Sequence, residues 1–464
     1  MLRKGDEVHV AVDRLAYGGR GIGRVDGLVV FVAGGAPGDL VRARVARVKR
    51  SYAEAEAVAV VAPSADRVPP RCPHFGSCGG CAWQHVAYPA QARAKEAIVR
   101  ESLGHLGGIA DADVRPVVAA DDPWYYRNKM EFSFHPDGTL GLHRRGDWNR
   151  IEPVEVCYLQ SAESVAIVRA VRAFARARGL PAYDPITHQG FLRSLVIREG
   201  RRTGDRLVGL ITGPGPFGEA EAFVAAVRGT VPEVCGIVRG IAAGASDGAP
   251  LTRVEVLDGR GYLEEVVGGL RFRIGLDTFF QTNTGQASRM VDYIVDQARP
   301  QPGRVIFDLY CGVGTFSLAL ARAGARVTGV ELVSSSVEAA RANAALNGLE
   351  GVRFAAGDVR VVLPRLVIEV GAPDVLVLDP PRAGAGARVM RKVGRAGARR
   401  VIYVSCNPTT LAADLKALLP FGYRLVSVQP FDLFPQTYHV EAVAVLDRME
   451  EVSRDGSGSG HGPA

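Results

Sequence analysis

The sequence lacks the long apolar runs that membrane proteins need. No uninterrupted hydrophobic stretch approaches the roughly 18 residues of a membrane span, and the opening segment MLRKGDEVHV has no apolar signal core. Hydrophobic residues make up 47% of the chain and charged residues 23%, which is typical of a globular protein in water. We therefore expect a cytoplasmic protein without membrane contact, and we expect it to act as a monomer.

Cysteine is scarce, and its count is odd. Seven cysteines are spread over 464 residues of a chain that we expect to be intracellular, which argues against a framework of disulfide bonds. Some of these cysteines are therefore candidates for metal ligands or catalytic groups. The alternative is that they are small buried hydrophobic residues, which is the commonest role of free cysteine.

Acidic residues are outnumbered at the N-terminus. Residues 1–50 contain ten Lys or Arg against five Asp or Glu, which is most of the net charge of +7. The excess indicates a polyanionic partner. Residues 1–60 also alternate short β-rich runs with glycine turns, which predicts an OB-like β-barrel. Tyr17 and Tyr52 offer stacking surfaces for RNA bases, and the segment resembles a TRAM domain.

The rest of the chain divides into two further domains, so the predicted fold class is multidomain α/β. Residues 61–270 have a mixed α+β pattern, with helices around 86–106 and 161–178 and a hairpin at HPDGT. Within them, residues 84–117 are expected to pack on the following domain. Residues 271–448 alternate strands and helices, which predicts a Rossmann-like parallel sheet closed by two antiparallel strands. Residues 449–464 read as a disordered tail.

The alternating region carries a nucleoside-binding pattern. In DLYCGVGTFSLALA, Asp308 ends a strand and a Gly-x-Gly loop opens a helix from Thr315. Glu331 ends the next strand, where a carboxylate accepts hydrogen bonds from ribose hydroxyls. The third glycine of a dinucleotide-binding loop is missing, which favours S-adenosylmethionine (SAM). Asp358 and Asp379 end the third and fourth strands, so four acidic residues are expected to line one crevice.

Four cysteines form a second pattern. Cys72, Cys78 and Cys81 lie within CPHFGSCGGC, and Cys157 completes a set of four thiolates. Four cysteines satisfy either zinc or a [4Fe-4S] cluster, and one close triplet with a remote fourth ligand favours the cluster. The spacing does not match that of radical SAM enzymes.

A third pattern places a thiol between a strand and a helix, in VIYVSCNPTTLAADL. Cys406 beside a methyl donor suggests methylation of a pyrimidine at C5, because that carbon becomes nucleophilic only after a thiolate adds to C6. Glu441 then serves as the base that removes the C5 proton. The helix that follows Cys406 predicts a lowered pKa for its thiol. Phe431, Phe434 and Tyr438 are either stacking surfaces for a flipped base or ordinary core.

These segments, with FFQTN, LDPPR and LFPQTYHVEAVAVL, resemble the SAM-dependent RNA 5-methyluridine methyltransferases from the barrel to about residue 448. The resemblance implies Cys406 as nucleophile and Glu441 as base, and it makes the cysteine set the ligands of a [4Fe-4S] cluster. It also implies a SAM pocket of Gln281, Tyr310, Thr315, Glu331, Asp358 and Asp379. Thr315 stands where some members have asparagine, and no role is implied for Cys311 or Cys235.

The same resemblance favours 23S ribosomal RNA over transfer RNA as the substrate. Three other readings stay open. A methyltransferase acting on an exocyclic nitrogen would need neither Cys406 nor Glu441. An RNA cytosine C5 methyltransferase would need a second cysteine beside Asp379, where none is found. A non-catalytic RNA-binding iron-sulfur protein would retain only a vestigial SAM pocket.

Overall fold

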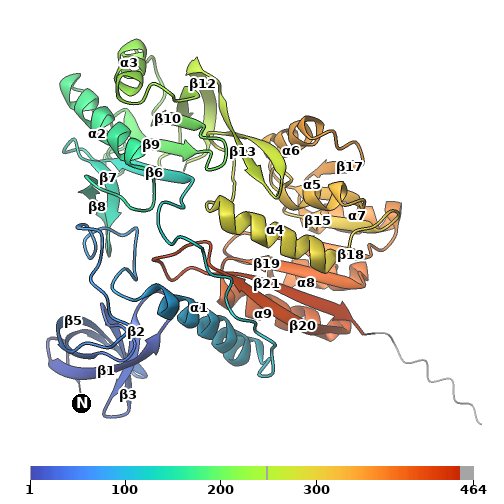
Figure 1. Cartoon of the computed structure of the whole chain (residues 1–464), viewed down its shortest axis with the longest axis horizontal. Helices are drawn as coiled ribbons and strands as arrows, with labels where there is room; N and C mark the ends of the chain where they lie inside the picture. Colours follow the sequence, from blue (N-terminus) through green and yellow to red (C-terminus); the bar gives the residue numbers. More distant parts are fainter. Residues whose placement is uncertain (1, 247–248, 450–464) are drawn as a thin grey trace, which may run out of the picture.

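The structure, a computed structural model, describes residues 2–246 and 249–449 (Figure 1). The predicted tail at 449–464 therefore lies, apart from Met449, outside the described residues. Within the described ranges, no helix is both long and apolar enough to cross a membrane.

The N-terminal segment forms the predicted barrel. Five strands close on themselves in the order β1-β2-β3-β5-β4, with bounds β1 Glu7–Leu15, β2 Gly21–Val25, β3 Leu28–Ala33, β4 Leu40–Val48 and β5 Tyr52–Ala62. Alternate residues of these strands, such as Val10, Val30 and Val41, are fully buried, because successive side chains of a strand point to opposite faces. The barrel interior is therefore a small apolar core of its own.

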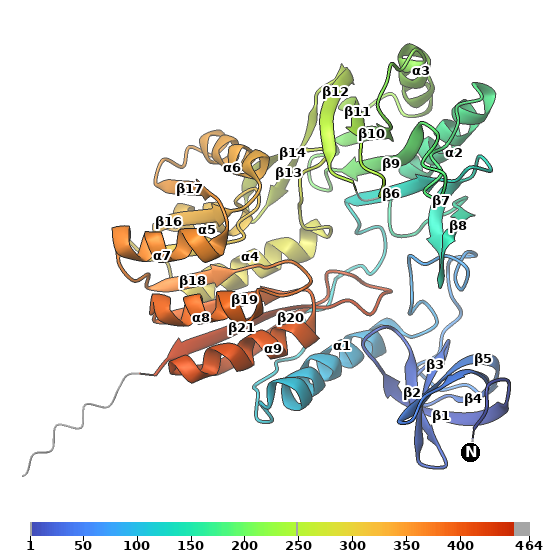
Figure 2. The ribbon, with the colours of Figure 1, turned by 180° about the vertical axis from the view of Figure 1, so that it is seen from behind.

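A long helix joins the barrel to the C-terminal sheet. Helix α1 (Tyr88–Ser102) and the π-helical turn η1 (Leu103–Gly107) occupy the predicted helical segment. Val99 and Leu103 are fully buried in one core with the helix α9 (Pro408–Leu418), and both views show α1 running from the barrel to α9 and β20 (Figure 2). Lys95 and Asp432 form a salt bridge of 2.6 Å with both side chains fully buried.

The central region is a seven-stranded sheet covered on one face by two helices. Its strand order is β12-β11-β10-β9-β6-β7-β8. The elements are β6 Lys129–Phe134, β7 Leu140–Arg144, β8 Asp147–Pro153, α2 Ala162–Ala177, β9 Leu192–Glu199, β10 Arg206–Thr212, α3 Ala220–Thr230, β11 Gly236–Ala242 and β12 Leu251–Gly259. The predicted hairpin turn and the helix α2 are confirmed, and α3 is an additional helix.

A two-stranded hairpin leads into the C-terminal domain. Its strands are β13 (Tyr262–Val267) and β14 (Leu270–Gly275), and it is followed by the helix α4 (Thr284–Ala298). Leu263 and Phe272 of the hairpin share a core with Met290 of α4 and with the helices that follow.

The C-terminal domain is a second seven-stranded sheet, in the order β17-β16-β15-β18-β19-β21-β20. Its strands are β15 Val305–Leu309, β16 Arg326–Glu331, β17 Val352–Ala356, β18 Val375–Leu378, β19 Arg400–Ser405, β20 Tyr423–Phe431 and β21 Glu441–Arg448. Its other helices are α5 Thr315–Arg322, α6 Ser334–Leu346, α7 Val359–Val370, α8 Gly386–Ala396 and the short 3-10 turn η2 Leu419–Phe421 after α9.

The two closing strands determine which residues lie at the edge of this sheet where the parallel strands end. Strands β15 to β19 are parallel, whereas β21 is antiparallel to both β19 and β20 and lies between them. The start of β21 therefore lies at the same edge as the carboxyl ends of the parallel strands, which is where ligands bind in open α/β sheets.

Candidate active site

Cys406 lies between the end of β19 and the start of α9. Asn407 is the N-cap of α9, and its side chain accepts a hydrogen bond of 3.1 Å from the N–H of Thr409. Pro408 occupies the first helical position, where a missing N–H costs no helical bond. The thiol is half-buried at the open edge of the sheet.

Glu441 is brought to the thiol by the register of β21. Ser405 pairs with Ala442, so the next residue of each strand, Cys406 and Glu441, lies at the adjoining position of the ladder. The side chain of Glu441 is buried. The structure thus brings together the two residues predicted to carry the chemistry.

Asp379 and Gln281 complete the group around the thiol. Asp379 directly follows β18, and Gln281 lies between β14 and α4. Gln281 Nε2 donates a hydrogen bond of 3.3 Å to Asp379 Oδ2. The backbone carbonyl of Gln281 accepts a bond of 2.8 Å from the side chain of Asn128, which ties it to the central sheet.

Negative charge is unfavourable throughout this group. Burial raises the pKa of Asp379 to about 7, and burial and then Asp379 raise the pKa of Glu441 well above its usual value. Burial, followed by Glu441 and Asp379, raises the pKa of the Cys406 thiol to about 12, while Arg382 lowers it. The prediction of a lowered pKa for this thiol is therefore wrong for the protein alone, because desolvation and two carboxylates outweigh the favourable helix start.

The glycine loop and Glu331 meet as the sequence predicts. Gly312 has φ of 54°, and a Cβ at this position would meet no atom within 4 Å. The N–H of Gly312 donates a bond of 3.1 Å to Glu331 Oε2, and the N–H of Val333 donates one of 2.9 Å to Oε1. Each carboxylate oxygen keeps lone-pair capacity for a ribose hydroxyl. Thr315, half-buried, is the first residue of α5.

Tyr310 and Asp358 line one hollow beside this loop, together with Leu332 and the start of α8. Tyr310 adopts a left-handed backbone conformation with φ of 63°. Asp358 is the N-cap of α7, and the side-chain and backbone hydrogen bonds from Arg360 lower the pKa of its carboxyl group.

Asp308 does not line the crevice. Its side chain is fully buried and accepts a hydrogen bond of 2.5 Å from Ser317 Oγ of α5. Burial raises its pKa to about 7. The expectation that four acidic residues line one crevice is therefore wrong for Asp308, whose side chain is fully buried and bonded to Ser317.

The four cysteines of the second pattern line one pocket. Cys72, Cys78, Cys81 and Cys157 surround it together with apolar side chains that include Leu142 and Val154. The N–H of Gly80 donates a bond of 3.3 Å to Cys78 Sγ. Within residues 2–246 and 249–449, no group of three or more His, Cys, Asp or Glu residues is placed to hold a single metal ion. Of the other three cysteines, Cys406 lies at the candidate active site, Cys311 is buried in the core and Cys235 is half-buried outside the pocket of the four.

Backbone amides are directed at the sulfurs of this pocket. The N–H groups of His74 and Phe75 lower the pKa of Cys72, and those of Leu159 and Gln160 lower that of Cys157, although burial raises both more strongly. Such bonds stabilise thiolates. The donor set therefore fits a group that four thiolates bind.

Some residues near the thiol were not assigned from the sequence. Arg382, in the DPPR segment, is a charged neighbour of Cys406. Tyr438 shares an edge-to-face contact with Tyr17 of the barrel, at 5.5 Å between ring centroids. Only its place in the DPPR segment could have indicated that Arg382 lies near the thiol. No local sequence pattern predicts that Tyr17 lies at this site.

The aromatic residues predicted as stacking surfaces lie in different environments. Phe431 is buried in the core, and Phe434 packs against the same cluster. Tyr438 is half-buried and lies 4.2 Å from His439 between ring centroids. Tyr52 packs edge to face on Phe31 within the barrel. Tyr438 is thus the one of the three predicted residues whose ring contacts the barrel, through Tyr17.

Comparisons with known proteins identify the family of this chain. The family described as tRNA (Uracil-5-)-methyltransferase matches residues 262–449, and the TRAM domain matches residues 2–58. An uncharacterised RNA methyltransferase of Gloeobacter violaceus is 41% identical over 96% of this chain and 98% of its own length. One of Nitratidesulfovibrio vulgaris is 42% identical, over 96% and 97%.

A solved structure is similar over nearly the whole chain. The crystal structure of Pyrococcus abyssi tRNA (uracil-54, C5)-methyltransferase in complex with S-adenosyl-L-homocysteine matches with a TM-score of 0.75 and 28% identity. The match covers 94% of this chain and 99% of that one.

Proposed function

Since this chain belongs to the SAM-dependent tRNA (uracil-5-)-methyltransferase family, we propose that it methylates C5 of one uridine in RNA through Cys406 and Glu441. The observation that carries the proposal is the ladder between β19 and β21, which places a thiol and a buried carboxylate at adjoining positions. A methyltransferase acting on an exocyclic nitrogen has no use for this pair.

The proposed reaction uses the two side chains in turn. The thiol of Cys406 loses its proton to water, its sulfur adds to C6 of the uracil, and the electron pair of the C5–C6 double bond takes up the methyl group at C5. SAM supplies that methyl group as an electrophile. Glu441 then removes the C5 proton, the double bond re-forms, and the sulfur leaves C6 with its electron pair. The raised pKa of Glu441 suits a carboxylate that must accept a proton.

Gln281, Tyr310, Thr315, Glu331, Asp358 and Asp379 are the residues that we propose to hold SAM. The hydrogen-bonding pattern of Glu331 and the open space beside Gly312 support the ribose end. Negative charges on Asp379, Glu441 and Cys406 would repel one another. A sulfonium cation near them would lower the free energy of their charged forms, which supports a cationic donor over a neutral one.

Cys72, Cys78, Cys81 and Cys157 are the residues that we propose to hold a [4Fe-4S] cluster. One close triplet of cysteines with a remote fourth favours a cluster over zinc, which more often takes two close C-x-x-C pairs. The apolar pocket and the N–H···S bonds support a cluster shielded from water. The protein isolated without oxygen should contain four irons per chain, and Cys81→Ser should lose them while the control Cys235→Ser keeps them.

For the substrate we propose 23S ribosomal RNA, with transfer RNA as the alternative. The similar structure from Pyrococcus abyssi is a tRNA methyltransferase and matches over 94% of this chain. The presence of the N-terminal barrel therefore does not distinguish an enzyme for ribosomal RNA from one for transfer RNA. RNA from cells with and without the gene should differ in one 5-methyluridine of 23S ribosomal RNA. A difference confined to transfer RNA would assign the alternative.

The activity itself is tested with RNA that carries tritium at C5 of uridine. SAM-dependent release of tritium into water is expected, and Cys406→Ala should abolish it. SAM binding without release would support the non-catalytic RNA-binding protein. Full methyl transfer by Cys406→Ala would support methylation of an exocyclic nitrogen.

A further inference from the structure

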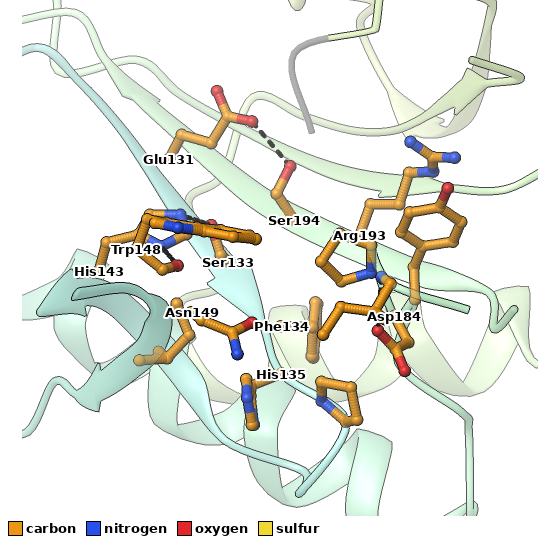
Figure 3. Close-up of a pocket in the computed structure, with 15 residues that line it drawn as sticks. Glu131, Ser133, Phe134, His135, His143, Trp148, Asn149, Asp184, Arg193 and Ser194 are labelled. Atoms are coloured by element: carbon orange, nitrogen blue, oxygen red, sulfur yellow. Dashed lines mark hydrogen bonds between the residues drawn. The ribbon is translucent and has the colours of Figure 1, made fainter. Parts of the chain in front are cut away.

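A second recess lies in the central domain, outside the site of Cys406. Its walls come from β6, the β7–β8 hairpin, the start of β9 and the loop at 183–186. In Figure 3, His143 and Trp148 lie on one side of the hollow, and Arg193 lies on the other. Glu131 and Ser133 belong to the face of β6 opposite to that of Met130 and Phe132, which are buried beneath α2.

Trp148 is the most unusual residue of this recess. Its side chain is 65% exposed, although burying an aromatic ring of this size is favourable. The hairpin that carries it is held by His143, whose Nδ1 donates to the carbonyl of Trp148 at 2.7 Å, while Nε2 lies 3.1 Å from Ser133 Oγ. The backbone at Trp148 is therefore fixed while the indole stays free to stack on a ligand.

Arg193 forms the opposite wall and has a free donor. Its residue is 9% exposed, and its guanidinium lies 3.8 Å from the centroid of the Tyr183 ring. The two terminal nitrogens donate to the carbonyls of Ser246 and Gly244. Its Nε is buried and has no hydrogen-bond partner among the described residues. A buried donor of this kind costs free energy until an acceptor reaches it.

Two carboxylates decide which ligand fits. Glu131 accepts a hydrogen bond of 2.8 Å from Ser194, and the backbone N–H of Ile186 lowers the pKa of Asp184. Anionic side chains repel a phosphate but accept hydrogen bonds from amino groups. An exposed indole and two acceptors are together groups that recognise an unstacked base of RNA.

Strand β6 joins the recess to the loop that carries Gln281 of the candidate active site. Asn128, just before β6, donates to the carbonyl of Gln281, and the strand then runs to Ser133. Five residues of strand span about 17 Å. A base bound in the recess would therefore belong to a nucleotide near the modified uridine and distinct from it.

We propose that this recess binds a second, amino-bearing base (adenine, cytosine or guanine) of the RNA substrate, stacked on Trp148. The proposal rests on the proposed function in that the ligand is taken to be part of the same RNA. Trp148 is a binding residue in this account and takes no part in the chemistry.

Binding is tested without catalysis, by fluorescence. Trp148 is the exposed member of three tryptophans, because Trp83 is buried and Trp124 is partly buried. Short oligomers of adenosine or cytidine, which cannot be methylated at a uridine, should quench its emission, and a uridine oligomer should quench it less. Trp148→Phe should remove the quenching. Equal quenching by all oligomers, or quenching only by a basic peptide, would overturn the proposal.

Catalysis provides the second test. Trp148→Ala should raise KM for RNA about fivefold or more, as the loss of one stacked base predicts, with kcat unchanged. Trp148→Phe should keep most of the affinity. Ile368→Ala, which alters a residue of α7 that is 85% exposed, should change neither constant. An unchanged KM in Trp148→Ala would contradict the proposal for the recess and leave the proposed function intact. If RNA quenched the fluorescence but the protein transferred no methyl group, only the proposed function would be contradicted.

Discussion

The ring of Tyr17, in the β1–β2 loop of the barrel, meets the ring of Tyr438 edge to face, at 5.5 Å and an interplanar angle of 88°. Tyr438 precedes Glu441 by three residues, and both tyrosines influence the pKa of Arg382. The barrel therefore contributes the side chain of Tyr17 to the surroundings of the thiol.

Removing the Tyr17 ring should consequently impair methylation. We expect Tyr17→Ala to lower kcat/KM by about two- to tenfold, the range that an edge-to-face pair supports, and Tyr17→Phe to lower it less. Steady-state assays with SAM and RNA measure this. Phe31→Ala disturbs an aromatic pair within the barrel itself and serves as the control. An equal loss in that variant would attribute the effect to barrel stability.

The pKa of Cys406 should be visible in its alkylation by iodoacetamide. With a pKa of about 12, the rate should rise about tenfold per pH unit up to at least pH 10, whereas an ordinary thiol levels off above about pH 9. Mass spectrometry of the Cys406 peptide separates this residue from the other cysteines. A plateau near pH 9 in the unmodified protein would contradict the raised pKa.

Two variants should shift this profile in opposite directions. At high pH Glu441 is ionised, so Glu441→Gln removes a negative neighbour, lowers the pKa of the thiol and speeds alkylation. Arg382→Gln removes the positive neighbour that lowers that pKa, so alkylation should slow. Shifts of the same sign in both variants would show that local charge does not set the pKa.

The buried pair of Lys95 and Asp432 should hold α1 against the catalytic sheet. Lys95→Met leaves the Asp432 charge buried without its partner and should cost about 3–5 kcal/mol of unfolding free energy. The double variant Lys95→Met with Asp432→Leu should recover much of this loss. Lys416→Met, at an exposed position of α9, should change stability by about 0.5 kcal/mol or less. Denaturant unfolding measures all three.

Local patterns predicted the elements that depend on local interactions. The helix from Thr315 was predicted with the start that the structure has, because a Gly-x-Gly loop before an apolar run leaves little choice of start. The end of one strand at Glu331 and of another just before Cys406 followed from the alternation of apolar strands and polar turns.

Long-range pairing was beyond such patterns. The position of β21 between β19 and β20, and the contact of Tyr17 with Tyr438, join segments whose approach no local periodicity encodes. The raised pKa of Cys406 has the same origin, because the helix start is visible in the sequence and the burial among distant carboxylates is not.

The most direct test of the central claim uses Glu441→Gln with SAM and substrate RNA. Without the carboxylate, C5 should be methylated but keep its proton, so the sulfur cannot leave and methylated RNA should remain bound covalently through Cys406. Digestion and peptide mapping should find the methylated nucleotide on that residue. Attachment at a different residue, or turnover by Glu441→Gln at the rate of the wild-type protein, would contradict the account.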